Sequence, residues 1–598
     1  MDTMKEEQQL LAYLKAHGAV EPKVIPGKKE VTFLSKSTGI PQVWKWRQDD
    51  TSGVQQYSNL EDRIMSVHHS SSGGKTIVGM DHNGNEKQQL FLLTESGTSV
   101  EELVKSKDHF HRFGGWSPKE DKISFASNRR HPGFFDVYVF DLESRTEELM
   151  YEFDGSCTPV CWTKDGESII LRLIDTNIDH SLYLFHIKSK QLIRIGQEQL
   201  NGRYPAIELK DDGEGGFLLT DAGKDTLAVF QFSFQDPSIL HEVLSIEKWD
   251  IEEIKLSSDK SKLLFTLNEG GISKLGIYYF DRQTYEFVEG LPRGVYNSLS
   301  WLSEDELVVG VKSSVLPGDI WKVDLHHDNA ERLTFIGEEK SISDLWMEPE
   351  LCSFTSFDGL EVPYFLYGKK NESQPVVIYV HGGPESQIRS TFNPVIQYLA
   401  AKGFAVAAPN VRGSMGYGRK YVKLDDVRKR MDAVADLKWL VDDLVENHKV
   451  DAKKVGVMGR SYGGFMVLAA LTHYPDIWAA GVDIVGISHF KTFLENTGSW
   501  RRKIREYEYG SLAEDVDFFE EIAPLNHTDK ITAPLLVFHG RNDVRVPVSE
   551  AEQITADLKK QRKQVELVVF EDEGHQTEKV ENHIAMNTKI VAFLKKFL

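Results

Sequence analysis

The sequence predicts three parts: a short N-terminal helix, a seven-bladed β-propeller and an α/β domain with a mostly parallel sheet. Three observations predict this fold class. The chain has 598 residues, which is too long for a single hydrophobic core. A strand pattern recurs roughly every 46 residues through the first half of the chain. Beyond about residue 350, apolar strands alternate with helical patterns instead.

Residues 1–18 have the pattern of one amphipathic helix. Thr3 begins a capping-box motif, Leu10 and Leu14 share one face, and Gly18 can end the helix. The apolar face of this helix must be covered. We expect it to pack either on the C-terminal domain or on a second subunit, so a homodimer is one expectation.

Residues 19–349 repeat one sequence pattern. Each repeat has an apolar residue, a polar turn and an apolar run, as in "WSPKEDKISF" and "WTKDGESIIL", and a second strand such as "DVYVFDL" follows about twenty residues later. The repeats begin near residues 24, 69, 116, 162, 209, 256 and 301. A period of about 40 to 50 residues with several strands indicates a propeller of seven blades. Two β-sandwiches are the alternative, which the near-constant period disfavours.

Residues 350–598 have the pattern of an α/β domain. Near-continuous apolar runs indicate strands that are buried on both faces, hence a parallel sheet covered by helices. The segment "MDAVADLKWLVDDLVEN" has helical spacing and supplies one such helix. The predicted strands are 375–380, 404–410, 455–459, 480–485, 534–540 and 565–571.

Composition excludes several classes of function. The formal net charge is −21, which opposes binding to nucleic acid or to an anionic membrane. The N-terminus lacks the apolar region of a signal peptide, and no segment has the length of apolar sequence that spans a membrane. The three cysteines have no metal-binding spacing. We therefore expect a cytoplasmic protein that uses no metal and no cofactor.

The motif Gly459-Arg460-Ser461-Tyr462-Gly463 marks a candidate nucleophile. It follows a predicted strand and precedes the helical run "GGFMVLAALTHY", which is the setting of a nucleophile elbow. The two glycines allow the strand and the helix to approach closely. The sequence therefore predicts that Ser461 presents its hydroxyl at the carboxyl ends of the strands.

A serine hydroxyl needs a base to act as a nucleophile at neutral pH. Asp543 follows the strand 534–540, and His575 follows the strand 565–571. The chain order Ser461, Asp543, His575 is that of the α/β-hydrolase triad. We expect His575 to act as the base and Asp543 to hold its tautomer.

The oxyanion of an acyl-transfer reaction needs backbone donors. The N–H of Tyr462 is one candidate, and the N–H of Gly383, in the loop "HGGPES", is the second. A competing motif, "GSMGYGRK", lacks the Lys and the Ser or Thr that a phosphate-binding loop requires. We therefore do not expect phosphate binding there.

These motifs together resemble the prolyl oligopeptidase family of serine peptidases. The resemblance covers nearly the whole chain and is strongest in "HGGP", "NVRGSMGYGRKY", "GRSYGGF", "NDVRVP" and "EGH". The "HGGP" loop is similar to that of the acylaminoacyl peptidase branch. The resemblance implies an α/β-hydrolase domain after a propeller, and implies that Arg545 holds a substrate carbonyl. It also implies an apolar specificity pocket formed by Val485, Trp500, Ile504 and Tyr507.

By this resemblance we expect a serine exopeptidase that releases N-acylated amino acids from short blocked peptides through an acyl-Ser461 intermediate. A broader oligopeptidase or an esterase with the same triad is the alternative. A third reading is a propeller scaffold for partner proteins with an inactive hydrolase domain. The sequence retains every member of the triad, which disfavours that reading.

Overall fold

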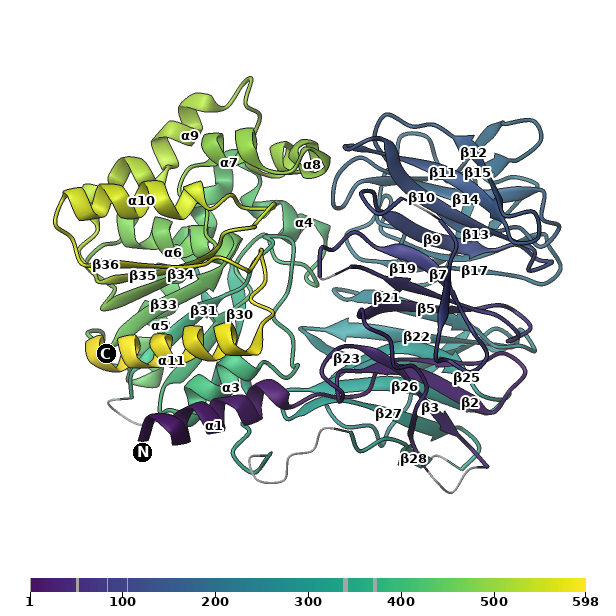
Figure 1. Cartoon of the computed structure of the whole chain (residues 1–598), viewed down its shortest axis with the longest axis horizontal. Helices are drawn as coiled ribbons and strands as arrows, with labels where there is room; N and C mark the ends of the chain where they lie inside the picture. Colours follow the sequence, from purple (N-terminus) through teal and green to yellow (C-terminus); the bar gives the residue numbers. More distant parts are fainter. Residues whose placement is uncertain are drawn as a thin grey trace. The chain divides into compact units, whose positions relative to one another are not determined.

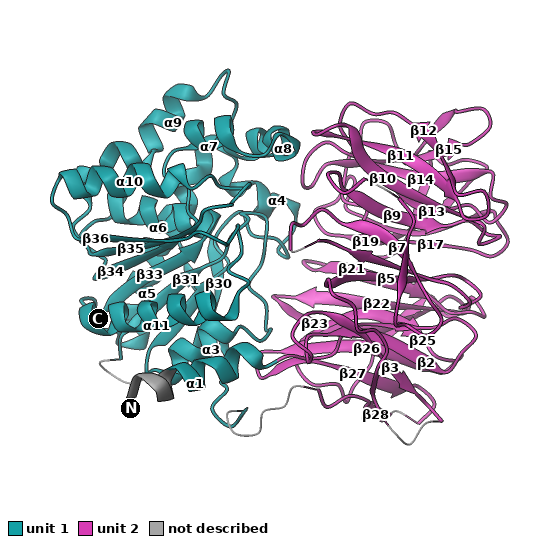
Figure 2. Ribbon diagram, in the orientation of Figure 1, with its two compact units in different colours: residues 1–16, 339–598 teal, residues 17–338 magenta. Residues whose placement is uncertain are grey.

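A computed structural model describes residues 2–49, 53–82, 84–104, 106–327, 329–336, 343–368 and 374–598, with the side chains of residues 2–6 excepted. The chain divides into two compact units. Residues 1–16 and 339–598 form unit 1, and residues 17–338 form unit 2 (Figure 2). Unit 2 is thus inserted in the sequence between the first helix and the rest of unit 1.

The core of unit 1 is an eight-stranded sheet (Figure 1). Its order is β29-β30-β32-β31-β33-β34-β35-β36. The pairs β29–β30 and β30–β32 are antiparallel, and the six strands from β32 to β36 are parallel. The strands are β29 (Glu350–Thr355), β30 (Glu361–Tyr367), β31 (Val376–Val380), β32 (Ala405–Pro409), β33 (Val455–Arg460), β34 (Ala480–Ile484), β35 (Leu535–Gly540) and β36 (Val565–Phe570).

Helices cover both faces of this sheet, as its apolar strands require. Figure 1 shows α1, α3 and α11 on one side, and α6 and α10 on the other. The α-helices are α1 (Asp2–Lys15), α3 (Pro394–Ala401), α4 (Arg419–Val422), α5 (Arg430–His448), α6 (Tyr462–His473), α7 (Phe490–Asn496), α8 (Ser499–Tyr509), α9 (Val516–Ile522), α10 (Ser549–Lys560) and α11 (Val580–Phe597). Short 3₁₀ helices are η1 (Lys423–Asp425), η2 (Val427–Lys429) and η3 (Pro524–Lys530).

The N-terminal helix α1 packs within its own unit. It contacts α3 and α11. Leu10 and Tyr13 are fully buried, and the Tyr13 ring lies 5.8 Å from the Tyr398 ring on α3. Lys402 donates a hydrogen bond of 2.9 Å to the Gln9 side chain. The apolar face of α1 is therefore covered by unit 1, and it no longer supplies an argument for a homodimer.

Unit 2 consists of antiparallel strands in groups of four. The first four groups are β1 (Val20–Val24), β2 (Glu30–Ser35), β3 (Gln42–Arg47), β4 (Gln55–Gln56); β5 (Ile64–His69), β6 (Thr76–Met80), β7 (Gln89–Leu93), β8 (Val100–Glu102); β9 (His111–Trp116), β10 (Lys122–His131), β11 (Phe134–Asp141), β12 (Thr146–Tyr151); and β13 (Ser156–Trp162), β14 (Ser168–Ile174), β15 (His180–His186), β16 (Leu192–Ile195). The others are β17 (Ile207–Leu209), β18 (Gly215–Thr220), β19 (Ala228–Ser233), β20 (Leu240–Leu244); β21 (Asp250–Leu256), β22 (Lys262–Glu269), β23 (Ile272–Tyr279), β24 (Thr284–Phe287); and β25 (Val295–Trp301), β26 (Glu306–Ser313), β27 (Leu316–Asp324), β28 (Asn329–Arg332).

The first and last groups of unit 2 lie side by side. Strand β1 contacts β25, β26 and β27, and the Ala19 N–H donates to the Gly318 carbonyl at 3.0 Å. One parallel bridge, between Phe135 and Ser156, joins the third and fourth groups into a single sheet of eight strands. Many small sheets are what a propeller requires. The count of seven blades stays a prediction.

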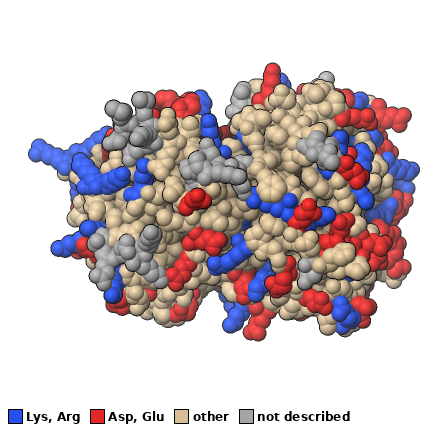
Figure 3. Space-filling view, turned by 90° about the horizontal axis from the view of Figure 1, so that it is seen from below, with Lys and Arg blue, Asp and Glu red and all other residues tan. Residues whose placement is uncertain are grey.

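The surface carries charges of both signs. On the face drawn in Figure 3, acidic and basic side chains are interspersed, and no continuous basic stripe crosses it. Among the helices that the structure describes, none is long and apolar enough to cross a membrane.

Candidate active site

Ser461 lies in a sharp turn between β33 and α6. Its backbone is left-handed, with φ 60° and ψ −118°, a conformation that costs a non-glycine residue roughly 1–3 kcal/mol. Its N–H donates to the Ile484 carbonyl at 2.9 Å, which fixes the turn to the neighbouring strand β34. A Cβ on Gly463 would lie 2.2 Å from the Val380 carbonyl oxygen. Only glycine therefore fits where the helix passes the sheet.

Asp543 and His575 form a hydrogen-bonded pair. They follow β35 and β36, respectively, and both are buried. The distance from His575 Nδ1 to Asp543 Oδ2 is 2.7 Å. An ionised carboxylate only accepts hydrogen bonds, so Nδ1 carries the proton and Nε2 has a free lone pair. The second carboxylate oxygen accepts the backbone N–H groups of Arg545 and Val546 at 2.8 and 2.9 Å.

The protonation states of this pair suit a base and its supporting carboxylate. Burial lowers the pKa of the His575 imidazole below its usual 6.5, although the hydrogen bond and charge of Asp543 oppose the shift. Burial alone would raise the pKa of Asp543, but the hydrogen bond and charge of His575 bring it below its usual 3.8. At neutral pH, His575 is therefore neutral and Asp543 is ionised.

Ser461 and His575 line the same pocket, which has a volume of about 530 Å³ and is formed entirely by unit 1. Gly382, Gly383 and Arg545 also line it. A pocket of this size suits a small ligand. The remaining lining residues are Tyr367, Tyr379, Val380, His381, Ser386, Gln387, Ile388, Arg389, Thr391, Asn393, Ile396, Arg460, Arg501, Arg505 and Gln576.

The loop that carries Gly383 passes close to the nucleophile. A Cβ on Gly382 would lie 3.4 Å from Ser461 Cβ. The Gly383 carbonyl points away into hydrogen bonds, since it accepts from the Arg505 guanidinium at 3.0 Å and the Tyr509 hydroxyl at 3.4 Å. In the described part of the chain, neither the Gly383 N–H nor the Tyr462 N–H has a hydrogen-bond acceptor. Both donors remain available to a ligand oxygen.

A second loop holds the first one in place. The His381 Nε2 atom lies 2.9 Å from the Ser414 hydroxyl, which itself donates to the Val411 carbonyl at 2.6 Å. Asn410 makes a two-way contact with Ile388: its Oδ1 atom accepts the Ile388 N–H at 2.6 Å and its amide donates to the Ile388 carbonyl at 3.0 Å. The segments "HGGPES" and "NVRGSMGYG" therefore form one braced structure, and oxyanion donors must be held rigidly in this way.

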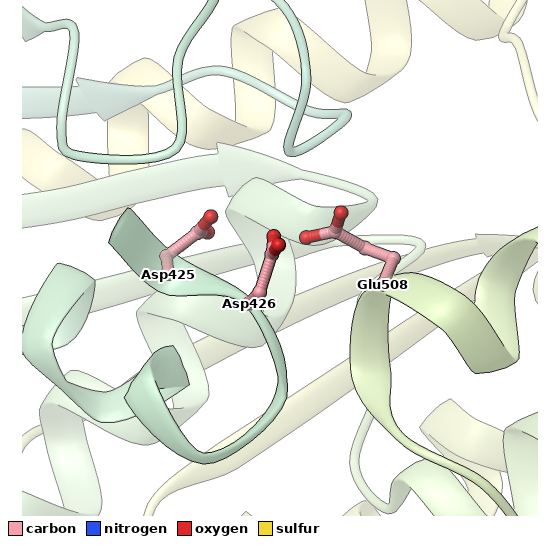
Figure 4. A group of neighbouring side chains, drawn as sticks. All are labelled: Asp425, Asp426 and Glu508. Atoms are coloured by element: carbon pink, nitrogen blue, oxygen red, sulfur yellow. The ribbon is translucent and has the colours of Figure 1, made fainter. Parts of the chain in front are cut away.

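A cluster of three carboxylates lies outside this pocket, and one of them contacts the Tyr462 side chain. Figure 4 shows the side chains of Asp425, Asp426 and Glu508 close together. Arg430, which is fully buried, forms ion pairs with both Asp425 and Glu508. The Tyr462 hydroxyl donates to Asp425 at 3.1 Å. Burial raises the pKa of Asp425 to about 7. We interpret this cluster as a structural support for Tyr462, because the Arg430 guanidinium supplies the cation that its carboxylates need.

The four residues expected to form an apolar specificity pocket do not line this one. Val485 is buried with φ 49°, and Tyr507 is 50% exposed. Trp500 and Ile504 lie on α8, but the same helix presents Arg501 and Arg505 to the pocket. The sequence motifs do not predict a role for these arginines. Their i, i+4 spacing in "RRKIRE" places both on one helix face, and that signal was available.

Comparison with known proteins points to one family. Residues 390–598 match the model of the prolyl oligopeptidase family. Dipeptidyl aminopeptidase BIII of Pseudoxanthomonas mexicana is 34% identical over 39% of this chain and 34% of its own length. The acylamino-acid-releasing enzyme of Arabidopsis thaliana is 27% identical over 40% of this chain and 32% of its own length. The chain thus spans about a third of the length of these curated relatives.

The fold of the whole chain also has solved counterparts. A puromycin-hydrolysing peptidase of Mycobacterium tuberculosis superposes with a TM-score of 0.83. The match covers 98% of this chain and 96% of that one, at 17% sequence identity. At this identity the likeness concerns the fold alone.

Proposed function

We propose, from the match of residues 390–598 to the model of the prolyl oligopeptidase family, that the protein is a serine peptidase acting on short peptides. The observation that carries the proposal is that His575, hydrogen-bonded to Asp543, lines one pocket with Ser461, which sits in a strained turn. The roles assigned to these residues below are part of the proposal.

Ser461 Oγ attacks the scissile carbonyl carbon while His575 Nε2 takes its proton. The oxyanion that forms accepts hydrogen bonds from the N–H groups of Tyr462 and Gly383. His575 then gives its proton to the leaving amine, the carbon–nitrogen bond breaks, and an acyl-Ser461 ester remains. Water attacks this ester with His575 again as the base, which releases the acid and restores the serine. Asp543 stabilises the imidazolium in both steps.

We propose further that the substrates have blocked N-termini, with an N-acylated amino acid as the product. The described lining of the pocket contains no Asp or Glu that could bind the ammonium of a free N-terminus, and it contains five arginines that would repel one. A neutral acyl group avoids this repulsion, and Arg545 could donate to its carbonyl. A broader oligopeptidase or esterase remains the second candidate, because the same triad serves either reaction.

The test uses Ser461→Ala on a panel of acetylated peptides, free-amine peptides and nitrophenyl esters. We expect loss of kcat on the order of 10⁴-fold or more for every substrate that the wild type hydrolyses, because the nucleophile is gone. A fluorophosphonate probe should label wild type and not the variant. Ser353→Ala, at an exposed serine on β29, is the matched control and should keep both properties. Undiminished hydrolysis by Ser461→Ala would refute the proposed mechanism.

We also propose that the groups of four strands in unit 2 are the seven blades of one closed propeller. The contact of β1 with β25, β26 and β27 supports closure of such a ring.

A further inference from the structure

The pocket of Ser461 is cationic in an otherwise acidic protein. The chain has a formal net charge of −21, yet the described lining contains arginines and no carboxylate. An apolar or neutral peptide substrate does not require this charge. The arginines of the lining are Arg389, Arg460, Arg501, Arg505 and Arg545.

Two of these arginines support the backbone of the site. Arg460 donates to the His575 carbonyl at 2.7 Å and to the Thr577 hydroxyl at 3.3 Å. Arg505 donates to the Gly383 carbonyl at 3.0 Å and pairs with Glu385 at 3.4 Å. Arg460 therefore supports the backbone at His575, and Arg505 supports the loop that carries Gly383.

Arg501 has no comparable supporting role among the described residues. It is partly buried in the first turn of α8, and no carboxylate forms an ion pair with it within the described ranges of the chain. Its charged neighbours include Arg505 and Arg545, whose repulsion the carboxylate of Asp543 opposes more weakly. Burial, and then the repulsion of these two arginines, lower the pKa of Arg501 to about 10. A cation in this position is costly unless an anion joins it.

Hydrogen bonds connect the start of α8, which carries Arg501, to the segment that carries Arg545. The Gly498 N–H, just before α8, donates to the Val544 carbonyl at 3.1 Å. The Thr497 hydroxyl donates to the Arg545 carbonyl at 2.7 Å. These bonds fix the start of α8 to the segment that follows Asp543, which in turn accepts the Arg545 N–H. Arg501 and Arg545 therefore line the pocket of Ser461 from segments that are bonded to each other.

We propose that Arg501, together with Arg545, binds a carboxylate of the substrate close to the scissile bond. A planar guanidinium binds a carboxylate through two parallel hydrogen bonds, so the arrangement would select and orient an acidic substrate. The carboxylate could belong to an Asp or Glu side chain or to the C-terminus of a short peptide. This inference rests on the proposed peptidase function and narrows its substrate class.

Hydrolysis of matched acetylated peptides tests it. One arm compares Glu with the isosteric Gln on either side of the scissile bond, and the other compares a free C-terminal acid with its amide. We expect kcat/KM to favour the acid by roughly 10- to 100-fold in one arm, which identifies the source of the carboxylate. Arg501→Gln should abolish that preference, so that acid and neutral partners are hydrolysed with equal kcat/KM. Arg501→Lys should restore part of it.

Arg502→Gln is the matched control, since Arg502 is an exposed neighbour on α8. It should keep the full preference. Equal rates on acid and neutral partners in every arm, or an unchanged preference in Arg501→Gln, would overturn the inference while the peptidase function stands. Absence of hydrolysis and of fluorophosphonate labelling would instead refute the peptidase function.

A binding experiment tests the carboxylate site independently of the peptidase function. Calorimetry with Ser461→Ala protein measures the affinities of N-acetylglutamate, N-acetylglutamine and a short acetylated peptide as acid and amide. We expect tighter binding of at least one acid than of its neutral partner, and loss of the difference when Arg501→Gln is added. Equal affinities for acid and neutral partners would overturn the carboxylate site without reference to turnover.

Discussion

Ser461 shows at the scale of one residue how the fold prepares chemistry. Its positive φ is a strained conformation. The hydrogen bond from its N–H to the Ile484 carbonyl and the close approach of Gly463 to the Val380 carbonyl keep the backbone in this conformation. The backbone geometry of the turn therefore places the Ser461 Cβ at the pocket, close to Gly382.

The pH profile of hydrolysis tests the state of His575. The base must be neutral, and burial lowers its pKa below 6.5. Activity should therefore persist as the pH falls through 6.5 and decline only below that value. The measurement is kcat/KM against pH for a substrate without ionisable groups. A midpoint above 7 for the acid limb would contradict the assigned environment.

Some residues of the candidate site can be predicted from the sequence, and others cannot. Ser461, Asp543 and His575 were predicted because each follows a strand of the same sheet, and the structure places each at such a strand end. Arg501 and Arg505 were not predicted. Their spacing shows that they share a helix face, but which face of α8 meets the pocket depends on the bonds from Gly498 and Thr497 to the segment after Asp543.

The parallel strands are the elements that the sequence predicted best. Their apolar runs are nearly continuous because both faces of the sheet are buried, so their limits lie close to those predicted. Helix α1 was also predicted from its own pattern. The elements that cover its apolar face, α3 and α11, could not be predicted, because they lie far from it in sequence and are brought near only by the folded sheet.

Packing of α1 on unit 1 predicts a stability effect. Leu10→Ala removes a fully buried side chain and should lower the free energy of unfolding by about 2–5 kcal/mol. Denaturant titration, followed by loss of hydrolytic activity, measures the change. Gln8→Ala on the exposed side of the same helix is the control and should alter stability by less than about 0.5 kcal/mol. Equal stability of Leu10→Ala and wild type would show that α1 is not docked in solution.

At the scale of the whole molecule, the two units differ in how their strands are connected. Unit 2 is built from local hairpins, so its repeat was visible in the sequence. The predicted propeller requires its first and last groups to meet, and β1 contacts the last group although about 300 residues separate them. Unit 1 has strands joined by helices and takes α1 from the other end of the chain.

Gly18 tests the contact between the first and last groups of unit 2. A Cβ there would lie 2.2 Å from the Gly318 carbonyl oxygen, so Gly18→Ala must displace backbone. We expect the free energy of unfolding to fall by about 1–3 kcal/mol. We also expect faster amide hydrogen exchange in β1 and β27, measured by mass spectrometry. Gly74→Ala, whose Cβ would meet only the Ser72 side chain at 3.2 Å, should leave exchange in these strands unchanged. Unaltered exchange in Gly18→Ala would mean that the two groups are not joined there.

The insertion of unit 2 between α1 and the rest of unit 1 has a consequence for synthesis on the ribosome. Helix α1 is synthesised long before its partner α11, which begins only at Val580. At about 5–20 residues per second, α1 waits roughly half a minute to two minutes for that partner. Unit 2 is complete long before then and can fold first. During this interval the apolar face of α1 lacks one of the two helices that cover it in the folded unit.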